Sequence, residues 1–363
     1  MLSKIDISEQ ELLEKCPRVL RALLIDRTRT AWELEKKREQ SASIPVDFQR
    51  NIIWATNSYS EKGDGFGERD EIVVERITGT CQRIVQPRVV KNREIQRQRA
   101  KDMAEVFTPS WVCNAQNNLV DDAWFGRPNV FNTESVDESG AHVWTPTEGP
   151  VVFGERPSKT STKSWQDYVR DVRLEITCGE APYLCSRYDT VDGKQITDMN
   201  RRIGLLDRKL RVVTENTKKR ADWLKWAKEA VKSVYGFEWQ GDNLLLAREN
   251  VLATVQDHFE ARGCRGKGLG EPELLEFAEI ISWNLWQMDG LRMVLPYSCE
   301  ASVKRTPVQM ILFDPNPEPE TRGCSACAKS ELTGHDGIKC LIRDWSKTGD
   351  SQIIEFQSLI QKI

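Results

Sequence analysis

Short apolar segments alternate with long helical segments from Trp165 onward, and this alternation restricts the possible folds more than any other feature of the sequence. A strand that ends in a turn and is followed by a long helix is the repeating unit of a parallel sheet with crossover helices. The pattern therefore predicts an α/β fold. With 363 residues, 39% of them hydrophobic, the chain is long enough for one large domain or two ordinary ones.

The segments before Trp165 predict other kinds of structure. Residues 8–40 place apolar side chains three and four positions apart, which indicates helices, whereas residues 71–79, EIVVERITG, alternate as a strand does. Residues 126–163 are rich in Gly, Pro, Ser and Thr. This composition predicts a long connection with little regular structure.

The charge of the chain is nearly balanced, with 52 Lys and Arg against 55 Asp and Glu and a formal net charge of -3. Affinity for nucleic acid therefore has to come from local patches. One basic stretch contains Arg83, Arg88, Lys91, Arg93, Arg97, Arg99 and Lys101. It is a candidate phosphate-contacting face, because each cation that neutralises a phosphate releases a counterion. A solvated helix explains the same stretch equally well.

The expected location follows from two absences in the sequence. The first residues contain no uninterrupted apolar core of the signal-peptide type, and nowhere do about 18 apolar residues run together as a membrane span requires. We therefore expect a cytoplasmic protein. Because disulfides are disfavoured in that compartment, most of the ten cysteines are expected to be small buried hydrophobic side chains.

The segment LEITCGEAPYL, Leu174 to Leu184, reads as an apolar strand that breaks into a tight turn at Cys178-Gly179. A nucleotide-like ligand binds well at such a place, because backbone N–H groups are free past the end of a strand and a glycine lets the ligand approach. Taken alone, the same glycine is explained by a turn without a ligand.

Two further motifs have both a ligand-binding and a structural interpretation. Glu238 ends a second apolar strand, where an acid can accept hydrogen bonds from both hydroxyls of a ribose, or can simply favour the start of the following helix. Upstream, Thr108-Pro109 precedes a helix-like run, where a Thr cap followed by Pro is also an ordinary helix start.

In this order, the three motifs resemble those of the adenine-specific N6 DNA methyltransferases of bacterial restriction-modification systems. That family has an FxTP segment before the main sheet, a (D/E)PxCGxGxFL turn after the first strand and an acid after the second. The matching segments here are Val106 to Pro109, Glu175 to Leu184 and Tyr235 to Glu238. Wider stretches, among them IIWAT and NLWQMDGL, are similar to restriction enzyme modification subunits, so that the resemblance covers most of residues 50–300.

The resemblance implies a Rossmann-like S-adenosylmethionine-dependent methyltransferase core with an N-terminal α+β extension. It implies eight cofactor-binding residues: Phe107, Thr108, Pro109, Glu175, Cys178, Gly179, Glu238 and Asp289. The first three would line the cofactor pocket, the next three would hold the methionine end, and the last two would bind the ribose and the adenine amino group. Ala181 stands where the family has a second glycine, and Glu180 adds a charge beside the pocket.

The family's catalytic motif, (D/N)PP(Y/F), is not found in this sequence, so no catalytic residue is predicted. The nearest string is FDPNPEP, residues 313–319, where Glu318 stands in place of the aromatic residue that stacks on the flipped base. We read that string as a Pro-rich loop. The expected function is therefore the cofactor-binding part of a DNA methyltransferase, with DNA as a partner and with the catalytic and target-recognition parts on a missing C-terminal portion or another polypeptide.

Two alternatives belong to other classes. A non-catalytic methyltransferase-like assembly or DNA-binding subunit is favoured by the missing motif, whereas a restriction nuclease has little support because no clustered acid-acid-Lys pattern stands out. The predicted organisation has four parts: an N-terminal helical and strand extension (1–103), a cofactor-lining segment and linker (104–163), the methyltransferase-like core (164–312), and a Cys-containing loop region with a C-terminal helix (313–363).

A cysteine cluster near the end of the chain has the spacing C-x2-C-x7-H-x4-C, formed by Cys324, Cys327, His335 and Cys340. Three thiolates and one imidazole can complete a tetrahedral zinc site, in which the CxxC pair forms a tight chelate. The pattern predicts one zinc ion in a structural role, because four protein ligands leave no coordination position open. The presence of a single CxxC pair leaves ordinary buried cysteines as the alternative.

Overall fold

The computed structural model describes residues 8–91, 99–101, 108–153, 163–190, 192–263, 268–299, 302–303, 321–322, 324–331 and 333–360. The prediction of helices over residues 8–40 is confirmed by α1 (Glu9–Lys15), α2 (Pro17–Leu24) and α3 (Arg27–Glu39). The Ser8 and Asp26 side chains cap α1 and α3 by accepting backbone N–H bonds. The apolar face of α2 is buried and α2 packs against α10 (Glu271–Asn284), which ties the N-terminal helices to the main body.

A parallel sheet confirms the predicted α/β pattern. In the described residues its strands are β3 (Arg173–Glu175), β4 (Val234–Glu238) and β5 (Leu285–Gln287), in the order β3-β4-β5. Because the strands are parallel and adjacent, their carboxyl ends lie along one edge of the sheet.

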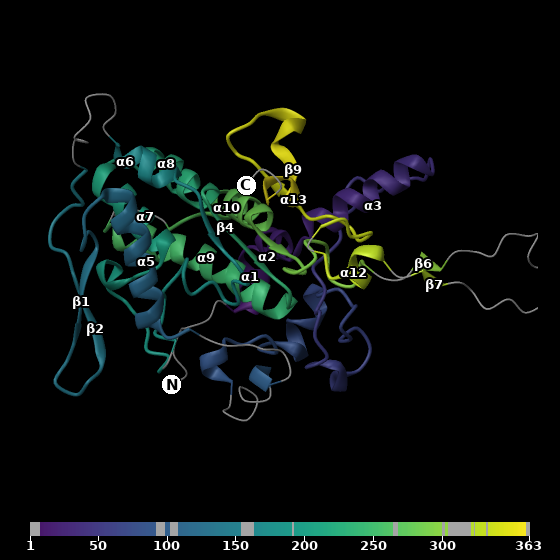
Figure 1. The fold of residues 1–363 in the computed structure, drawn as a ribbon, viewed down its shortest axis with the longest axis horizontal. Coiled ribbons are helices and arrows are strands. Elements are labelled where there is room, and N and C mark those ends of the chain that lie inside the picture. Colours follow the sequence, from purple (N-terminus) through teal and green to yellow (C-terminus); the bar gives the residue numbers. More distant parts are fainter. Residues whose placement is uncertain are drawn as a thin grey trace, which may run out of the picture.

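Long helices connect these strands, as crossover connections require. Helices α7 (Leu205–Asn216) and α8 (Arg220–Lys232) lie between β3 and β4, and α9 (Gly241–Ala261) and α10 lie between β4 and β5. Helix α9 is buried along most of its length and contacts β4, β5, α7 and α10 (Figure 1). It starts directly after β4, where a Cβ on Gly241 would lie 2.0 Å from the Ile53 carbonyl oxygen. Only glycine therefore lets the segment around Ile53 pack on this helix start.

The strand predicted over residues 71–79 is wrong. The structure has two short 3-10 helices instead, η2 (Val74–Arg76) and η3 (Gly79–Cys81), and a single bridge between Ile53 and Glu71. Beyond Ile72, whose N–H bonds to the Ile52 carbonyl at 2.8 Å, the segment forms local bonds such as that from the Ile77 N–H to the Val74 carbonyl at 3.1 Å. Local turns therefore satisfy the backbone groups that a strand would have offered to a neighbour.

The segment 126–163, predicted to have little regular structure, contains an antiparallel hairpin of β1 (Asn132–Val136) and β2 (His142–Pro146). Its turn is held by Asp137, whose carboxylate accepts bonds from the backbone of Ser139 and Ala141, and by Gly140 with a φ of +83°. The Gly, Ser and acidic residues that indicated a loop thus form the turn of a hairpin.

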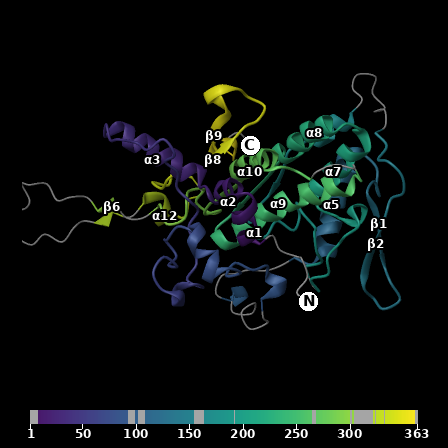
Figure 2. The same cartoon turned by 180° about the vertical axis from the view of Figure 1, so that it is seen from behind.

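The structure has several further helices and strands outside the parallel sheet and its crossover helices. They are α5 (Ser110–Phe125), α6 (Trp165–Arg170), β6 (Ser302–Val303), β7 (Thr321–Arg322), α12 (Ser325–Lys329), β8 (Leu341–Arg343), β9 (Ile353–Glu355), α13 (Gln357–Ile360), and the 3-10 helices η1 (Ser60–Lys62), η4 (Arg88–Val90), η5 (Met199–Arg201) and η6 (Gly349–Gln352). Both views show the β1–β2 hairpin at one end and α3 and α12 toward the other (Figures 1 and 2). Among the described residues, no helix combines the length and apolar character that crossing a bilayer requires.

Candidate functional site

Acidic residues lie at the carboxyl ends of all three described strands of the parallel sheet. Glu175 is the last residue of β3, Glu238 is the last residue of β4, and Asp289 follows β5 by two positions. The turn after β3 is bonded to the end of β4, since the Cys178 N–H donates to the Phe237 carbonyl at 2.8 Å. The structure thus brings these acids to one edge, called here the strand-end edge, where ligands bind in open α/β sheets.

The turn after β3 adopts an unusual backbone. Thr177, Gly179 and Ala181 have φ values of +46°, +53° and +63°, all in the left-handed region. A Cβ on Gly179 would meet no described atom within 4 Å, so the space beside this glycine is open to a ligand. At Ala181 the left-handed backbone conformation favours glycine over alanine.

Glu175 closes this turn from within. Its carboxylate oxygens accept hydrogen bonds from the backbone N–H groups of Tyr183 at 3.3 Å and Leu184 at 3.2 Å. Burial raises the pKa of Glu175 from 4.5 to about 8, despite these two donors. A cationic ligand group placed nearby would favour its ionised form.

Glu238, at the end of β4, is hydrogen-bonded to the turn that follows β3. One carboxylate oxygen accepts a bond from the Gly179 N–H at 2.9 Å, and the other accepts a bond from the Gln240 N–H at 3.1 Å. Burial also raises the pKa of this carboxyl group. A carboxylate has about four lone-pair sites, so these two bonds leave acceptor capacity for the two hydroxyls of a ribose. The residue present therefore fits the role that the resemblance implies.

A cavity of about 440 Å³ lies beside the turn. Four of the predicted cofactor residues line it: Thr108, Glu175, Cys178 and Gly179. The other lining residues come from α5, β3, the rest of the turn and the start of α7: Gln116, Asn117, Val120, Leu174, Ile176, Thr177, Glu180, Pro182, Tyr183 and Leu205. The cavity is within the size range of small-molecule sites, about 300 to 1,000 Å³.

The other predicted cofactor residues do not line this cavity. Pro109 is the N-cap of α5 and makes no side-chain cap bond. The residue before it, Thr108, does line the cavity, and its carbonyl accepts a bond from the Thr190 hydroxyl at 3.0 Å. Glu238 is buried, with 7% of the residue exposed, and is bonded to the Gly179 N–H. The Asp289 carboxylate accepts bonds from its own turn, including the Leu291 N–H at 2.9 Å. Phe107 lies outside the described residues.

The Glu180 carboxylate is buried and hydrogen-bonded within the protein. It accepts hydrogen bonds from the Tyr188 hydroxyl at 2.5 Å and from the Arg88 N–H at 2.7 Å, and the residue is only 2% exposed. The extra acid that the sequence places beside the pocket is therefore part of the support of the turn.

The basic stretch does not form the predicted phosphate-contacting face as a whole. Lys91 and Arg99 are buried next to Asp242 on α9, with Nζ and Nη2 at 3.8 and 2.8 Å from its carboxylate. Their positive charges lie beside the first turn of α9, where they stabilise the buried carboxylate of Asp242. Arg83 and Lys101 are exposed and Arg88 is half-buried, while Arg93 and Arg97 lie outside the described residues.

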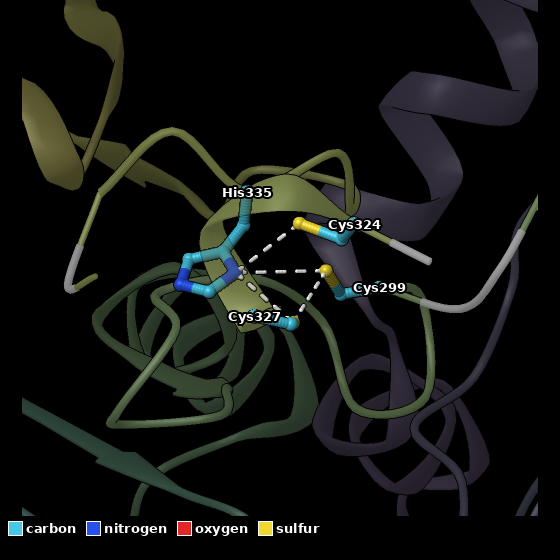
Figure 3. A group of neighbouring side chains, drawn as sticks. All are labelled: Cys299, Cys324, Cys327 and His335. Atoms are coloured by element: carbon cyan, nitrogen blue, oxygen red, sulfur yellow. Dashed lines mark hydrogen bonds between the residues drawn. The ribbon is translucent and has the colours of Figure 1, made fainter. Parts of the chain in front are cut away.

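A second candidate site is a cluster of Cys299, Cys324, Cys327 and His335, called here the Cys/His cluster (Figure 3). One ligand atom from each residue lies within 4.8 Å of the others. Three of these residues belong to the predicted zinc set. The backbone N–H groups of Cys327 and Asp336 lower the pKa of the Cys324 thiol, whereas burial raises the pKa of the Cys299 thiol beside it.

Cys340 was predicted as the fourth ligand, and the structure places it elsewhere. Its N–H bonds to the Met293 carbonyl at 3.4 Å, and its buried Sγ lies 3.6 Å from the Gln287 carbonyl. The segment after Met293 runs antiparallel to the segment before Cys340, as the bond from Leu295 N–H to the Ile338 carbonyl at 2.8 Å shows. This pairing carries Cys299, six residues beyond Met293, to the position beside His335.

Cys299 carried no local signal in the sequence, because it forms no short-spaced motif with another cysteine or histidine. The CxxC pair and His335 were visible because they lie within twelve residues of one another.

Comparisons of this chain with known protein families, with curated proteins and with solved structures find no match. The functional interpretation therefore depends on the strand-end edge and the Cys/His cluster themselves.

Proposed function

We propose that this chain binds S-adenosylmethionine at the strand-end edge, as the cofactor-binding part of a site-specific DNA adenine-N6 methyltransferase of a restriction-modification system. The observation that best supports this proposal is the hydrogen bond between the Gly179 N–H and the Glu238 carboxylate. It joins two motifs, 59 residues apart in the chain, that the resemblance assigns to the two ends of one cofactor. On this proposal, β3, β4 and β5 belong to a Rossmann-like methyltransferase core.

The residues of the strand-end edge fit the two ends of this cofactor differently. Its methionine end has a positively charged amino group, which the Glu175 carboxylate can bind from the wall of the cavity. Its ribose has two adjacent hydroxyls, which suit the carboxylate of Glu238. When bound, the cofactor supplies a methyl group for direct transfer to the exocyclic nitrogen of adenine.

Exposed apolar residues on β3 and at its ends support the proposal that the catalytic portion lies outside this chain. Val172, Leu174 and Ile176 occupy alternate positions and are 64%, 44% and 67% exposed, and Leu174 and Ile176 also line the cavity. Among the described residues, no strand pairs with the side of β3 opposite β4. Exposed apolar edge strands favour pairing with another chain segment. We therefore infer that a segment carrying the (D/N)PP(Y/F) motif packs here, and that DNA binds to the completed enzyme.

Calorimetric titration with S-adenosylmethionine tests the cofactor site. We expect saturable binding by the wild-type chain and a loss of about 30-fold in affinity in Glu238→Ala, since about 2 kcal/mol of hydrogen bonding is removed. Glu229→Ala on α8 removes an acid that forms an ion pair with Arg170, away from the strand ends, and should leave the affinity unchanged. Circular dichroism of each variant checks that it is folded. Absence of binding to the wild type, or equal binding by Glu238→Ala, would contradict the proposal.

A methylation assay tests the incompleteness of the site. We expect no transfer of a radioactive methyl group to DNA by this chain alone. Robust methylation by the purified chain would show that it contains an unrecognised catalytic motif. DNA binding without any affinity for the cofactor would instead support a non-catalytic assembly subunit.

A further inference from the structure

The geometry of the Cys/His cluster matches a tetrahedral metal site. Zinc bonds of about 2.3 Å to sulfur and about 2.0 Å to nitrogen place neighbouring sulfurs about 3.8 Å apart and a sulfur and a nitrogen about 3.5 Å apart. The Sγ atoms of Cys299 and Cys327 are 3.5 Å apart. His335 Nδ1 lies 3.6, 3.6 and 3.3 Å from the Sγ atoms of Cys299, Cys324 and Cys327.

The imidazole of His335 is oriented for metal binding. Its Nε2–H donates to the Glu331 carbonyl at 2.8 Å, which leaves the lone pair of Nδ1 directed at the three sulfurs (Figure 3). Metal-ligating histidines almost always donate their other ring nitrogen in this way. The histidine is 8% exposed and Cys324 is 4% exposed, whereas Cys299 and Cys327 are half-buried.

Close backbone packing positions Cys299 in this cluster. A Cβ on Gly337 would lie 2.8 Å from the Ser298 hydroxyl and 3.0 Å from the Cys299 Cβ, so glycine permits the two loops to touch. The Ser298 hydroxyl also accepts a bond from the Ile338 N–H at 3.0 Å. The fourth thiol is thus held in place by its neighbours on both loops.

We propose that Cys299, Cys324, Cys327 and His335 bind one structural zinc ion. Four protein ligands fill the tetrahedron and leave no position open for water or substrate, which separates a structural from a catalytic zinc. Three deprotonated thiols and one neutral imidazole give zinc, rather than calcium or magnesium, its preferred ligands.

The metal would connect distant parts of the chain. Cys299 lies three residues before β6, whereas Cys324 follows β7 by two residues and begins α12, so zinc would fasten together the two ends of the segment 300–323. The strands β6 and β7 lie beyond α12 at one end of the molecule (Figure 1). A clip that joins two distant points of a chain reduces the conformational freedom of the unfolded chain.

Metal analysis of the full chain tests this inference. We expect about one zinc per chain after purification without chelators, less than about a tenth in Cys299→Ser, and about one in Cys340→Ala. Cys81→Ser serves as a second control, because Cys81 is half-buried and outside the cluster. Replacement of zinc by cobalt in the wild-type chain should give the absorption bands of a tetrahedral site with thiolate ligands, a readout that needs no variant to fold.

Two results would overturn the proposal. One is a reduced wild-type chain that retains no zinc after reconstitution and gives no thiolate–cobalt bands, whether or not a disulfide between Cys299 and Cys327 is found instead. The other is loss of zinc in Cys340→Ala with full zinc in Cys299→Ser. Neither readout involves S-adenosylmethionine, so the zinc site and the proposed function fail or succeed independently.

Discussion

The strand-end edge and the Cys/His cluster are held in place by different kinds of bonds. At the strand-end edge, the carboxylates of Glu175 and Glu238 accept backbone N–H bonds, and the sheet positions both residues. In the Cys/His cluster, side chains from α12, its N-cap and two other segments meet, and no described strand of the parallel sheet contributes a ligand. The strand-end edge is therefore built by the fold itself, whereas the Cys/His cluster depends on the metal that we propose for it.

Removal of zinc should give the largest effect and should separate the two regions. Because structural zinc sites contribute several kcal/mol to folding, a chelator should increase the rate of proteolytic cleavage within residues 293–340 by about tenfold or more. The affinity for S-adenosylmethionine should change by less than about twofold. Limited proteolysis with mass spectrometry, combined with calorimetry, measures both. Unchanged cleavage after complete chelation would contradict the proposed dependence on metal.

Gly204→Ala should damage the strand-end edge instead. The added Cβ would lie 2.3 Å from the Leu184 carbonyl oxygen, a backbone atom at the end of the turn that Glu175 holds. We expect the free energy of unfolding to fall by about 3 kcal/mol, measured by urea denaturation, and cofactor binding to weaken.

Gly268→Ala is the matched control for this substitution, because its Cβ would meet no described atom within 4 Å. Its free energy of unfolding should stay within about 0.5 kcal/mol of the wild-type value. Equal stability of the two variants would show that the turn adapts more readily than its backbone contacts suggest.

The pH dependence of stability tests the burial of Glu175. Its pKa is about 8 in the folded protein and 4.5 ordinarily, so the folded state binds the extra proton between these values. The free energy of unfolding should therefore fall as the pH rises from 4.5 to 8, by at most about 5 kcal/mol from this group. Glu175→Gln should remove that part of the slope. Identical slopes in urea denaturation of both proteins would contradict the assignment.

Glu180→Gln should have the smallest effect. An amide can still accept the bond from the Arg88 N–H and can donate to the Tyr188 oxygen, so the support of the turn is retained. We expect the affinity for S-adenosylmethionine to remain within about threefold of the wild-type value in calorimetry. A loss of more than tenfold would mean that the charge of Glu180 acts on the cofactor directly.

The parts of the fold that the sequence predicts are those with local signals. The spacing of apolar residues identified the helices over 8–40 and the strands that end at Glu175 and Glu238. The hairpin around Asp137 was missed because its turn residues and short strands have the composition of a loop.

Long-range pairing accounts for the other errors. Arg99 belongs to a basic stretch, but its partner Asp242 lies far along the chain, so its burial could not be read from nearby residues. Cys299 joins Cys324 and Cys327 in the same way, through loops that only the folded chain brings together. The spacing of Cys324, Cys327 and His335 predicted three of the four cluster members, whereas Glu175 and Asp289 at the strand-end edge were expected only from the family resemblance.

The most direct test of the central claim is to locate the bound cofactor. Ultraviolet irradiation with S-adenosylmethionine that carries a radioactive methyl group, followed by peptide mapping, identifies the residues beside it. We expect the label in the peptides that line the cavity, residues 108–120 and 174–184, and its suppression by unlabelled S-adenosylhomocysteine. Label confined to other peptides, or label that the competitor does not reduce, would contradict a cofactor site at the strand-end edge.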